Sequence, residues 1–89
     1  MKVFATLRDL FGRGKIYVKL SEDSNILDLI LKLDRMIDKG FANKLLRNHE
    51  PDPNITILLN GREIRYLDGL NTKLKHEDFV AFVPPIAGG

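Results

Sequence analysis

The sequence predicts an α+β domain, because the spacing of its apolar residues changes twice along 89 residues. Apolar and polar residues alternate over residues 1–20, apolar residues recur every three or four positions over 25–38, and alternation returns after residue 54. A chain of 10.1 kDa supports one hydrophobic core. We therefore expect a single domain, with its folded body over residues 1–83 and an extended, flexible C-terminal tail over residues 84–89.

Residues 2–8 and 15–20 are predicted to pair as a β-hairpin. Their alternating pattern is typical of half-buried strands. The turn between them contains Gly12 and Gly14, which tolerate positive φ. The residues expected to face the core are Val3, Ala5, Leu7, Ile16, Val18 and Leu20.

Residues 25–38 are predicted to form the main helix. Asn25 is suited to cap its N-terminus, and Asp28 places a negative charge in its first turn. Lys39 and Gly40 are residue types that commonly end a helix. The apolar stripe expected to pack on the sheet contains Ile26, Leu29, Ile30, Leu33, and Met36 or Ile37.

The second half of the chain is predicted to return to strands after a short helix over residues 41–48. Residues 48–53 are expected to form a loop, since Pro51 and Pro53 resist both helix and sheet pairing. Asn60-Gly61 is a strong signal for a tight β-hairpin. The expected strand, return strand, crossover and final strand lie over 54–59, 62–66, 71–76 and 79–83, with a turn at Asp68-Gly69. This order is that of a β-grasp, a mixed sheet with one main helix across one face.

The composition excludes several classes of function. The chain has no cysteine, which removes disulfides, thiolate metal sites and a cysteine nucleophile. Its net charge of +2 does not favour nucleic acid as a partner, and no apolar run approaches the roughly 20 residues that span a membrane. His49 and His76 lack neighbouring ligands, so no metal site is expected. We expect a soluble, cytoplasmic domain without an active site of its own.

Positive charge is concentrated in residues 1–20. This segment holds five basic residues against Asp9 alone, a balance of +4, which leaves −2 on the rest of the chain. One interpretation is a solvated hairpin edge, where lysines discourage pairing with another strand. The other interpretation is a docking surface for an acidic partner.

The final segment, Pro84-Pro85-Ile86-Ala87-Gly88-Gly89, is the most informative. Two prolines favour an extended path that projects the tail away from the sheet. The side chains then become smaller, as is needed for a chain end that enters a narrow channel of another protein. The reacting group is then the Gly89 carboxylate, which must be activated first. Since the chain has no P-loop motif, a partner must supply the ATP chemistry.

The sheet face turned away from the helix is predicted to be unusually apolar, because a sheet covered on one side is normally polar on the other. Arg8 and Arg62 are expected to rim this apolar surface. Its members are Phe4, Leu58, Ala81 and Val83. Such a patch is typical of a protein-interaction surface, although single exposed apolar residues are common on any protein.

Three segments resemble a known family: the Asn60-Gly61 hairpin, residues 67–74 (LDGLNTKL) and residues 80–89 (VAFVPPIAGG). They resemble the ubiquitin-like sulfur carriers of the MoaD/ThiS superfamily, most closely the small subunit of molybdopterin synthase. The resemblance implies a β-grasp that is not catalytic alone and binds no cofactor stably. It implies that an activating enzyme of the ubiquitin type uses ATP to adenylate the C-terminal glycine. With a sulfur donor protein, the adenylate becomes a thiocarboxylate, which enters the large catalytic subunit and gives sulfur to a pterin precursor.

The resemblance also assigns roles by position. Gly89 is the acyl and sulfur carrier, and Gly88 gives access to the partner's channel. The residues that match the subunit interface or direct the tail are Phe4, Arg8, Val83, Pro84 and Pro85. The family's Gly-Asp pair before the last strand is Glu77-Asp78 here, which puts the glycine-dependent turn in question, and Phe79 stands where an acid is usual.

Other destinations for the sulfur remain open. Carriers of the thiamine pathway resemble this chain, but they are typically shorter and lack the proline pair. Carriers for tRNA thiolation share the same chemistry. Archaeal ubiquitin-like small modifiers resemble it more closely, and some of them are attached to lysines of other proteins.

Overall fold

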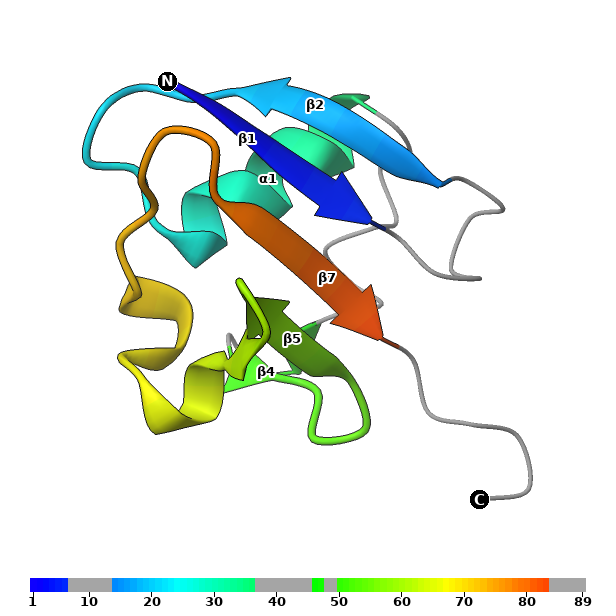
Figure 1. The fold of residues 1–89 in the computed structure, drawn as a ribbon. Coiled ribbons are helices and arrows are strands. Elements are labelled where there is room, and N and C mark those ends of the chain that lie inside the picture. The colour runs from blue at the N-terminus through cyan, green and yellow to red at the C-terminus, as the bar shows by residue number, and fades with distance from the viewer. Residues whose placement is uncertain (7–13, 37–45, 48–49, 84–89) are drawn as a thin grey trace.

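The computed structural model describes residues 1–6, 14–36, 46–47 and 50–83. Within them, five strands form a mixed sheet in the order β2-β1-β7-β5-β6 (Figure 1). The strands are β1 (Lys2–Thr6), β2 (Lys15–Lys19), β5 (Thr56–Leu59), β6 (Arg62–Glu63) and β7 (Phe79–Val83). Strand β1 pairs antiparallel with β2 and parallel with β7, and β7 pairs antiparallel with β5. With one helix across the sheet, this is the predicted β-grasp.

Helix α1 (Ile26–Met36) begins at a reciprocal cap. The Asp28 N–H donates to Asn25 Oδ1 and the Asn25 N–H donates to Asp28 Oδ2, each at 2.9 Å. The pair satisfies two backbone donors at the helix start. The predicted stripe is buried at Ile26, Leu29, Ile30 and Leu33, whereas Met36 is 51% exposed. Ile37, Lys39 and Gly40 lie outside the described residues.

The core lies between α1 and one face of the sheet. Alternate strand residues point toward the helix and are buried: Val3, Ala5, Val18, Ile57, Leu59, Val80 and Phe82. Ile16 and Leu20 are partly buried against the same cluster. These inward rows confirm the alternation predicted from sequence, and Leu7 lies outside the described residues. In Figure 1 the helix lies behind the strands, so the view shows the uncovered side of the sheet.

A second, two-stranded sheet departs from the prediction. Strand β3 (Leu46–Arg47) pairs antiparallel with β4 (Glu50–Pro51). The helix predicted over residues 41–48 is therefore wrong at 46–47, and the loop over 48–53 is wrong at 50–51; residues 41–45 and 48–49 lie outside the described residues. Pro51 is tolerated because it stands at the end of a very short ladder, where a missing N–H costs little.

The β5–β6 hairpin is confirmed, but its return strand is shorter than predicted. Asn60 and Gly61 have φ of 51° and 87°, the left-handed pair that a two-residue turn of this type requires. After β6 the chain forms a 3-10 helix, η1 (Ile64–Tyr66), in which Ile64 is 1% exposed. The chain leaves the sheet at this point because burial of Ile64 competes with continued pairing. A second 3-10 helix, η2 (Gly69–Asn71), follows.

Candidate functional site

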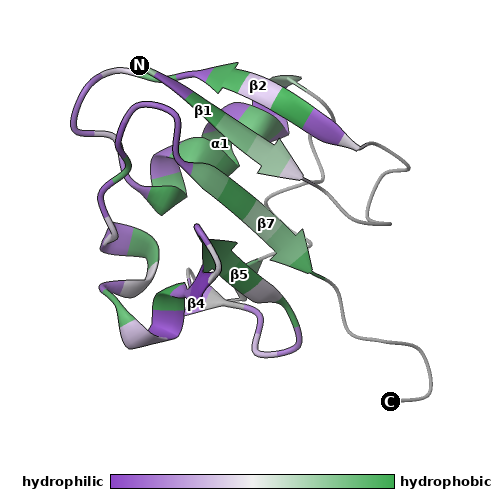
Figure 2. Ribbon diagram, in the orientation of Figure 1, coloured by the Kyte–Doolittle hydropathy of each residue, from purple (hydrophilic) through white to green (hydrophobic). Residues whose placement is uncertain are grey.

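The open face of the sheet, opposite α1, carries an apolar strip. Leu58 of β5 stands directly opposite Ala81 of β7, and Val83 follows two residues along the same strand. Phe4 of β1 stands opposite Phe79 of β7. Ala81 is only 8% exposed on this uncovered face, so its neighbours shield it. Figure 2 shows that β5 and β7 consist mostly of hydrophobic residues. Four predicted interface residues thus lie on one surface.

Arg62 does not join this strip. It stands opposite Leu59, whose side chain lies in the core on the helix side. Directly opposite residues of an antiparallel ladder project to the same face, so Arg62 lies on the helix side at the edge of the sheet. Its predicted place at the rim of the open face is therefore corrected. Glu63, opposite Leu58, takes the open-face position, with its Oε1 3.3 Å from Arg65 Nε.

Two aromatic residues that the interface prediction did not include extend the strip. Tyr17 of β2 stands opposite Phe4, which stands opposite Phe79, so the three rings form one row across β2, β1 and β7. The Phe4 and Tyr17 ring centroids lie 4.9 Å apart at 67°, an edge-to-face contact. Tyr17 is 60% exposed and Phe79 is 37% exposed. The alternation of Tyr17 with the inward Val18 was the one sequence signal for its place on this face.

The turn before β7 keeps its geometry with Glu77 in place of the family's glycine. Glu77 has φ of +70°, a conformation that costs a non-glycine residue roughly 1 kcal/mol. Asp78 secures the turn: its Oδ2 accepts a bond from the Lys75 N–H (2.7 Å) and its Oδ1 accepts one from Asn60 Nδ2 (3.0 Å). Asn60 Oδ1 accepts in turn from the Phe79 N–H (2.9 Å). These bonds tie the start of β7 to the β5–β6 hairpin.

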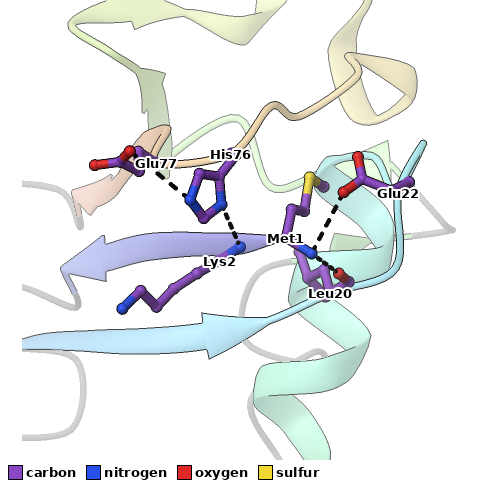
Figure 3. Close-up of polar contacts among 6 residues, drawn as sticks. All are labelled: Met1, Lys2, Leu20, Glu22, His76 and Glu77. Atoms are coloured by element: carbon purple, nitrogen blue, oxygen red, sulfur yellow. Dashed lines mark hydrogen bonds and ion pairs between the residues drawn. The ribbon is translucent and has the colours of Figure 1, made fainter.

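Figure 3 shows the start of β1 beside the same turn. The Lys2 N–H donates to His76 Nδ1 at 3.0 Å, which requires that nitrogen to be unprotonated. His76 Nε2 lies 3.7 Å from Glu77 Oε1. The Met1 α-ammonium donates to the Leu20 carbonyl at 2.7 Å. His76 therefore has a structural contact here.

Residues 1–6, 14–36, 46–47 and 50–83 hold neither a cluster of metal ligands nor a membrane-spanning helix. Those ranges contain no group of three or more His, Asp or Glu side chains placed to hold a metal ion. Their helix is not long and apolar enough to cross a membrane. His49 falls outside them.

The tail follows directly from this face. Strand β7 ends at Val83, and because β7 runs parallel to β1, Val83 lies at the end of the sheet away from Lys2 (Figure 1). Residues 84–89 and Arg8 lie outside the described residues. The roles assigned to the tail and to Arg8 stay predictions.

A β-grasp with an apolar open face, in a chain whose sequence ends in Gly-Gly, defines the class of small ubiquitin-like carriers and modifiers, which are not catalytic alone. The whole chain, residues 1–89, matches the ThiS family. The protein belongs to that family, within the superfamily of ubiquitin-like sulfur carriers.

Two relatives and two solved structures illustrate the similarity. The chain is 37% identical over 89 residues to small archaeal modifier protein 3 of Haloferax volcanii, covering 100% of this chain and 96% of the relative. Over 69 residues it is 38% identical to a protein of Archaeoglobus fulgidus that is named a putative sulfur carrier protein. This match covers 78% of this chain and 78% of the relative. 

The structures are complexes that contain a similar chain. One is the BexX/CysO complex of Amycolatopsis orientalis, with a TM-score of 0.83 and 18% identity, covering 98% of this chain and 99% of that one. The other is the complex of subunits 1 and 2 of molybdopterin-converting factor from Helicobacter pylori, with a TM-score of 0.57 and 22% identity over 100% of both chains. At these identities the likeness shows the fold alone.

Proposed function

We propose that this chain carries sulfur on the carboxyl group of Gly89 for molybdopterin synthesis. In this proposal a ubiquitin-type activating enzyme adenylates Gly89, a sulfur donor protein supplies the sulfur, and the large subunit of molybdopterin synthase receives it. ATP binds to the activating enzyme, so the carrier holds no cofactor. All of these steps are placed in the cytoplasm.

The observation that carries the proposal is the Pro84–Gly89 sequence, which follows β7 directly in a chain that matches the ThiS family over its full length. The apolar strip ends at Val83, the last residue before that tail. A partner that binds Leu58, Ala81 and Val83 therefore lies beside the start of the tail. Binding at the face and insertion of the tail then occur at one continuous surface.

The chemistry needs nothing from the carrier except its carboxylate. An oxygen of the Gly89 carboxylate attacks the α-phosphorus of ATP, and pyrophosphate leaves. A sulfide equivalent from the donor then attacks the acyl carbon, and AMP leaves with that oxygen. The product is the Gly89 thiocarboxylate, which transfers its sulfur to the pterin precursor and is restored to a carboxylate with oxygen from water. A small, unhindered glycine suits each attack at the acyl carbon.

A second function is favoured by a specific observation. The relative that is 37% identical over the whole chain is named a small archaeal modifier protein. The same acyl-adenylate, attacked by a lysine amine instead of sulfide, gives an isopeptide bond with loss of AMP. Delivery of the sulfur to thiamine or tRNA is a further alternative that uses the same loaded carrier.

Reconstitution tests the proposal. The full chain is incubated with ATP, the activating enzyme and a sulfur donor, and the C-terminal peptide is analysed by mass spectrometry. We expect one oxygen of Gly89 to be replaced by sulfur. Absence of that exchange with an enzyme that loads another carrier would contradict sulfur carriage. Transfer of the loaded sulfur to the pterin precursor by the large synthase subunit separates the molybdopterin role from the others, and Gly-Gly remnants on substrate lysines in cell digests report the modifier role.

A further inference from the structure

Lysines cover the exposed row of aromatic rings on the open face. Lys15 Nζ lies 4.9 Å from the Phe4 ring centroid and 5.9 Å from that of Phe79. Lys2 Nζ lies 5.2 Å from the Tyr17 ring centroid. An ammonium held over an aromatic face is attracted by the ring quadrupole, and its remaining N–H groups still point outward. The rings therefore hold the charges at defined places on the surface.

A third lysine adds to this charge. Lys19 stands directly opposite Lys2 on the β1–β2 ladder. It lies on the open face because it alternates with the inward Val18. Like charges directly opposite one another destabilise a ladder. The arrangement is unfavourable for the isolated domain and becomes favourable when an anionic surface covers it.

These charges lack an internal counterion among the residues that the structure describes. The ion pairs seen there join Met1 to Glu22 and Arg65 to Glu63. Lys2, Lys15 and Lys19 take part in neither of them. The surface made of these three lysines and the rings of Phe4, Tyr17 and Phe79 is named here the basic aromatic patch.

We propose that the basic aromatic patch docks an acidic partner protein, whose carboxylates meet the lysines while an apolar side chain packs beside the rings, on Ala81 and Val83 of the strip. The inference rests on the proposed function, since it gives the chemistry of a partner that also receives the tail. Continuity supports it: Phe79 leads along β7 to Ala81 and Val83, so the patch and the tail-proximal strip form one surface. Opposite charge across such an interface raises the association rate and fixes orientation.

The geometry favours a protein over single-stranded RNA. Bases bind to sheet surfaces by stacking on free aromatic faces. Here ammonium groups lie over the rings of Phe4 and Tyr17, and Phe4 and Tyr17 meet edge to face. Stacking a base would require those groups to leave their positions. Carboxylates need no such rearrangement.

A titration followed by NMR tests the patch without using the chemistry of Gly89. The full chain, labelled with a heavy nitrogen isotope, is titrated with a synthetic peptide of glutamates flanking one leucine, and with a matched peptide in which each glutamate is glutamine. We expect saturable shifts at the amides of Phe4, Tyr17 and Phe79 with the glutamate peptide, and affinity that falls as salt is added. We expect no such shifts with the glutamine peptide.

Two charge-reversal variants, one on the patch and one away from it, test the role of the three lysines. The variant K2E/K15E/K19E is expected to bind the glutamate peptide at least about tenfold more weakly. The variant K32E/R35E/K73E makes the same change in net charge away from the open face and is expected to bind within about twofold of the parent chain. Equal loss in both variants, shifts confined to other residues, or stronger binding of an oligouridine at the same amides would overturn the proposal. Failure of Gly89 loading would leave these results unchanged, so the two proposals fail separately.

Discussion

Both faces of the sheet carry apolar side chains, but only one face is covered by α1. On the helix side, Val3, Val80 and Phe82 are fully buried. On the open side, Tyr17 and Phe79 keep 60% and 37% of their surface exposed. The covered face stabilises the fold through burial, whereas the open face retains apolar surface that contributes little to stability. The difference is the basis of our proposal that the open face contacts other proteins.

Changes in the tail are expected to have the largest effect on sulfur loading and almost none on stability. Deleting Gly88 and Gly89 is expected to abolish loading with sulfur, because the reacting carboxyl group is lost or displaced. The melting temperature is expected to stay within about one degree, since the sequence predicts a tail that projects from the sheet and so has little burial to lose. Mass spectrometry and thermal unfolding of the same sample measure both effects. A large fall in melting temperature would show that the tail is part of the folded body.

The helix-covered face should behave in the opposite way. Leu33 is fully buried in α1, and Leu33→Ala is expected to lower the free energy of unfolding by about 2–5 kcal/mol through lost burial and a cavity. Loading of the remaining folded protein is expected to be normal. Urea unfolding gives the first quantity, and loading per folded molecule gives the second. An effect below about 1 kcal/mol would place Leu33 outside the tightly packed core.

A substitution on the open face sharpens the comparison. Leu58→Asp is expected to raise the KM for the carrier in adenylation by about tenfold, because a charge replaces apolar surface at the interface. Its free energy of unfolding is expected to fall by about 1–2 kcal/mol, less than for Leu33→Ala, since Leu58 is only half-buried but the new aspartate stands opposite Glu63. Kinetics at varied carrier concentration and urea unfolding provide the measurements. An unchanged KM would remove Leu58 from the interface with the activating enzyme.

The smallest expected effect lies in the turn before β7. Glu77→Gly is expected to stabilise the fold by about 0.5 kcal/mol, because relief of the positive φ exceeds the greater chain entropy of glycine. Its contact with His76 is exposed, with 60% and 70% of the two side chains accessible, so the loss of this contact matters little. Glu77→Ala keeps the strained conformation and is the matched control, with no gain expected. Stabilisation by alanine equal to that by glycine would show that the φ is not the cause.

Sequence reasoning succeeded where one local pattern determined the result. Alternation gave the inward residues of β1, β2 and β7, the 3.6-residue period gave the buried stripe of α1, and Asn60-Gly61 gave the hairpin. These patterns depend on neighbours that are close in sequence. The two residues that flank a two-residue hairpin turn pair with one another and project to the same face of the sheet. Applied to the inward Leu59, this rule predicts that Arg62 lies on the helix side.

The remaining features depend on distant contacts. The row of Tyr17, Phe4 and Phe79 requires the parallel register of β1 and β7, which lie far apart in the sequence. The two-residue strands β3 and β4 are too short to carry a periodic signal. Strand β6 ends early because Ile64 is buried in the core. The positive φ of Glu77 is maintained by the bonds of Asp78 to Lys75 and Asn60, which propensity does not reveal.

The most direct measurement follows the oxygen atoms of Gly89. The carrier is prepared with a heavy oxygen isotope at both oxygens of its C-terminal carboxyl group, and it is loaded in ordinary water with ATP, the activating enzyme and a sulfur donor. The AMP released should carry one heavy oxygen for each thiocarboxylate formed, because that oxygen attacks phosphorus before sulfide displaces it. AMP without the label, formed while the carrier gains sulfur, would show that the Gly89 carboxylate is not the group that is activated.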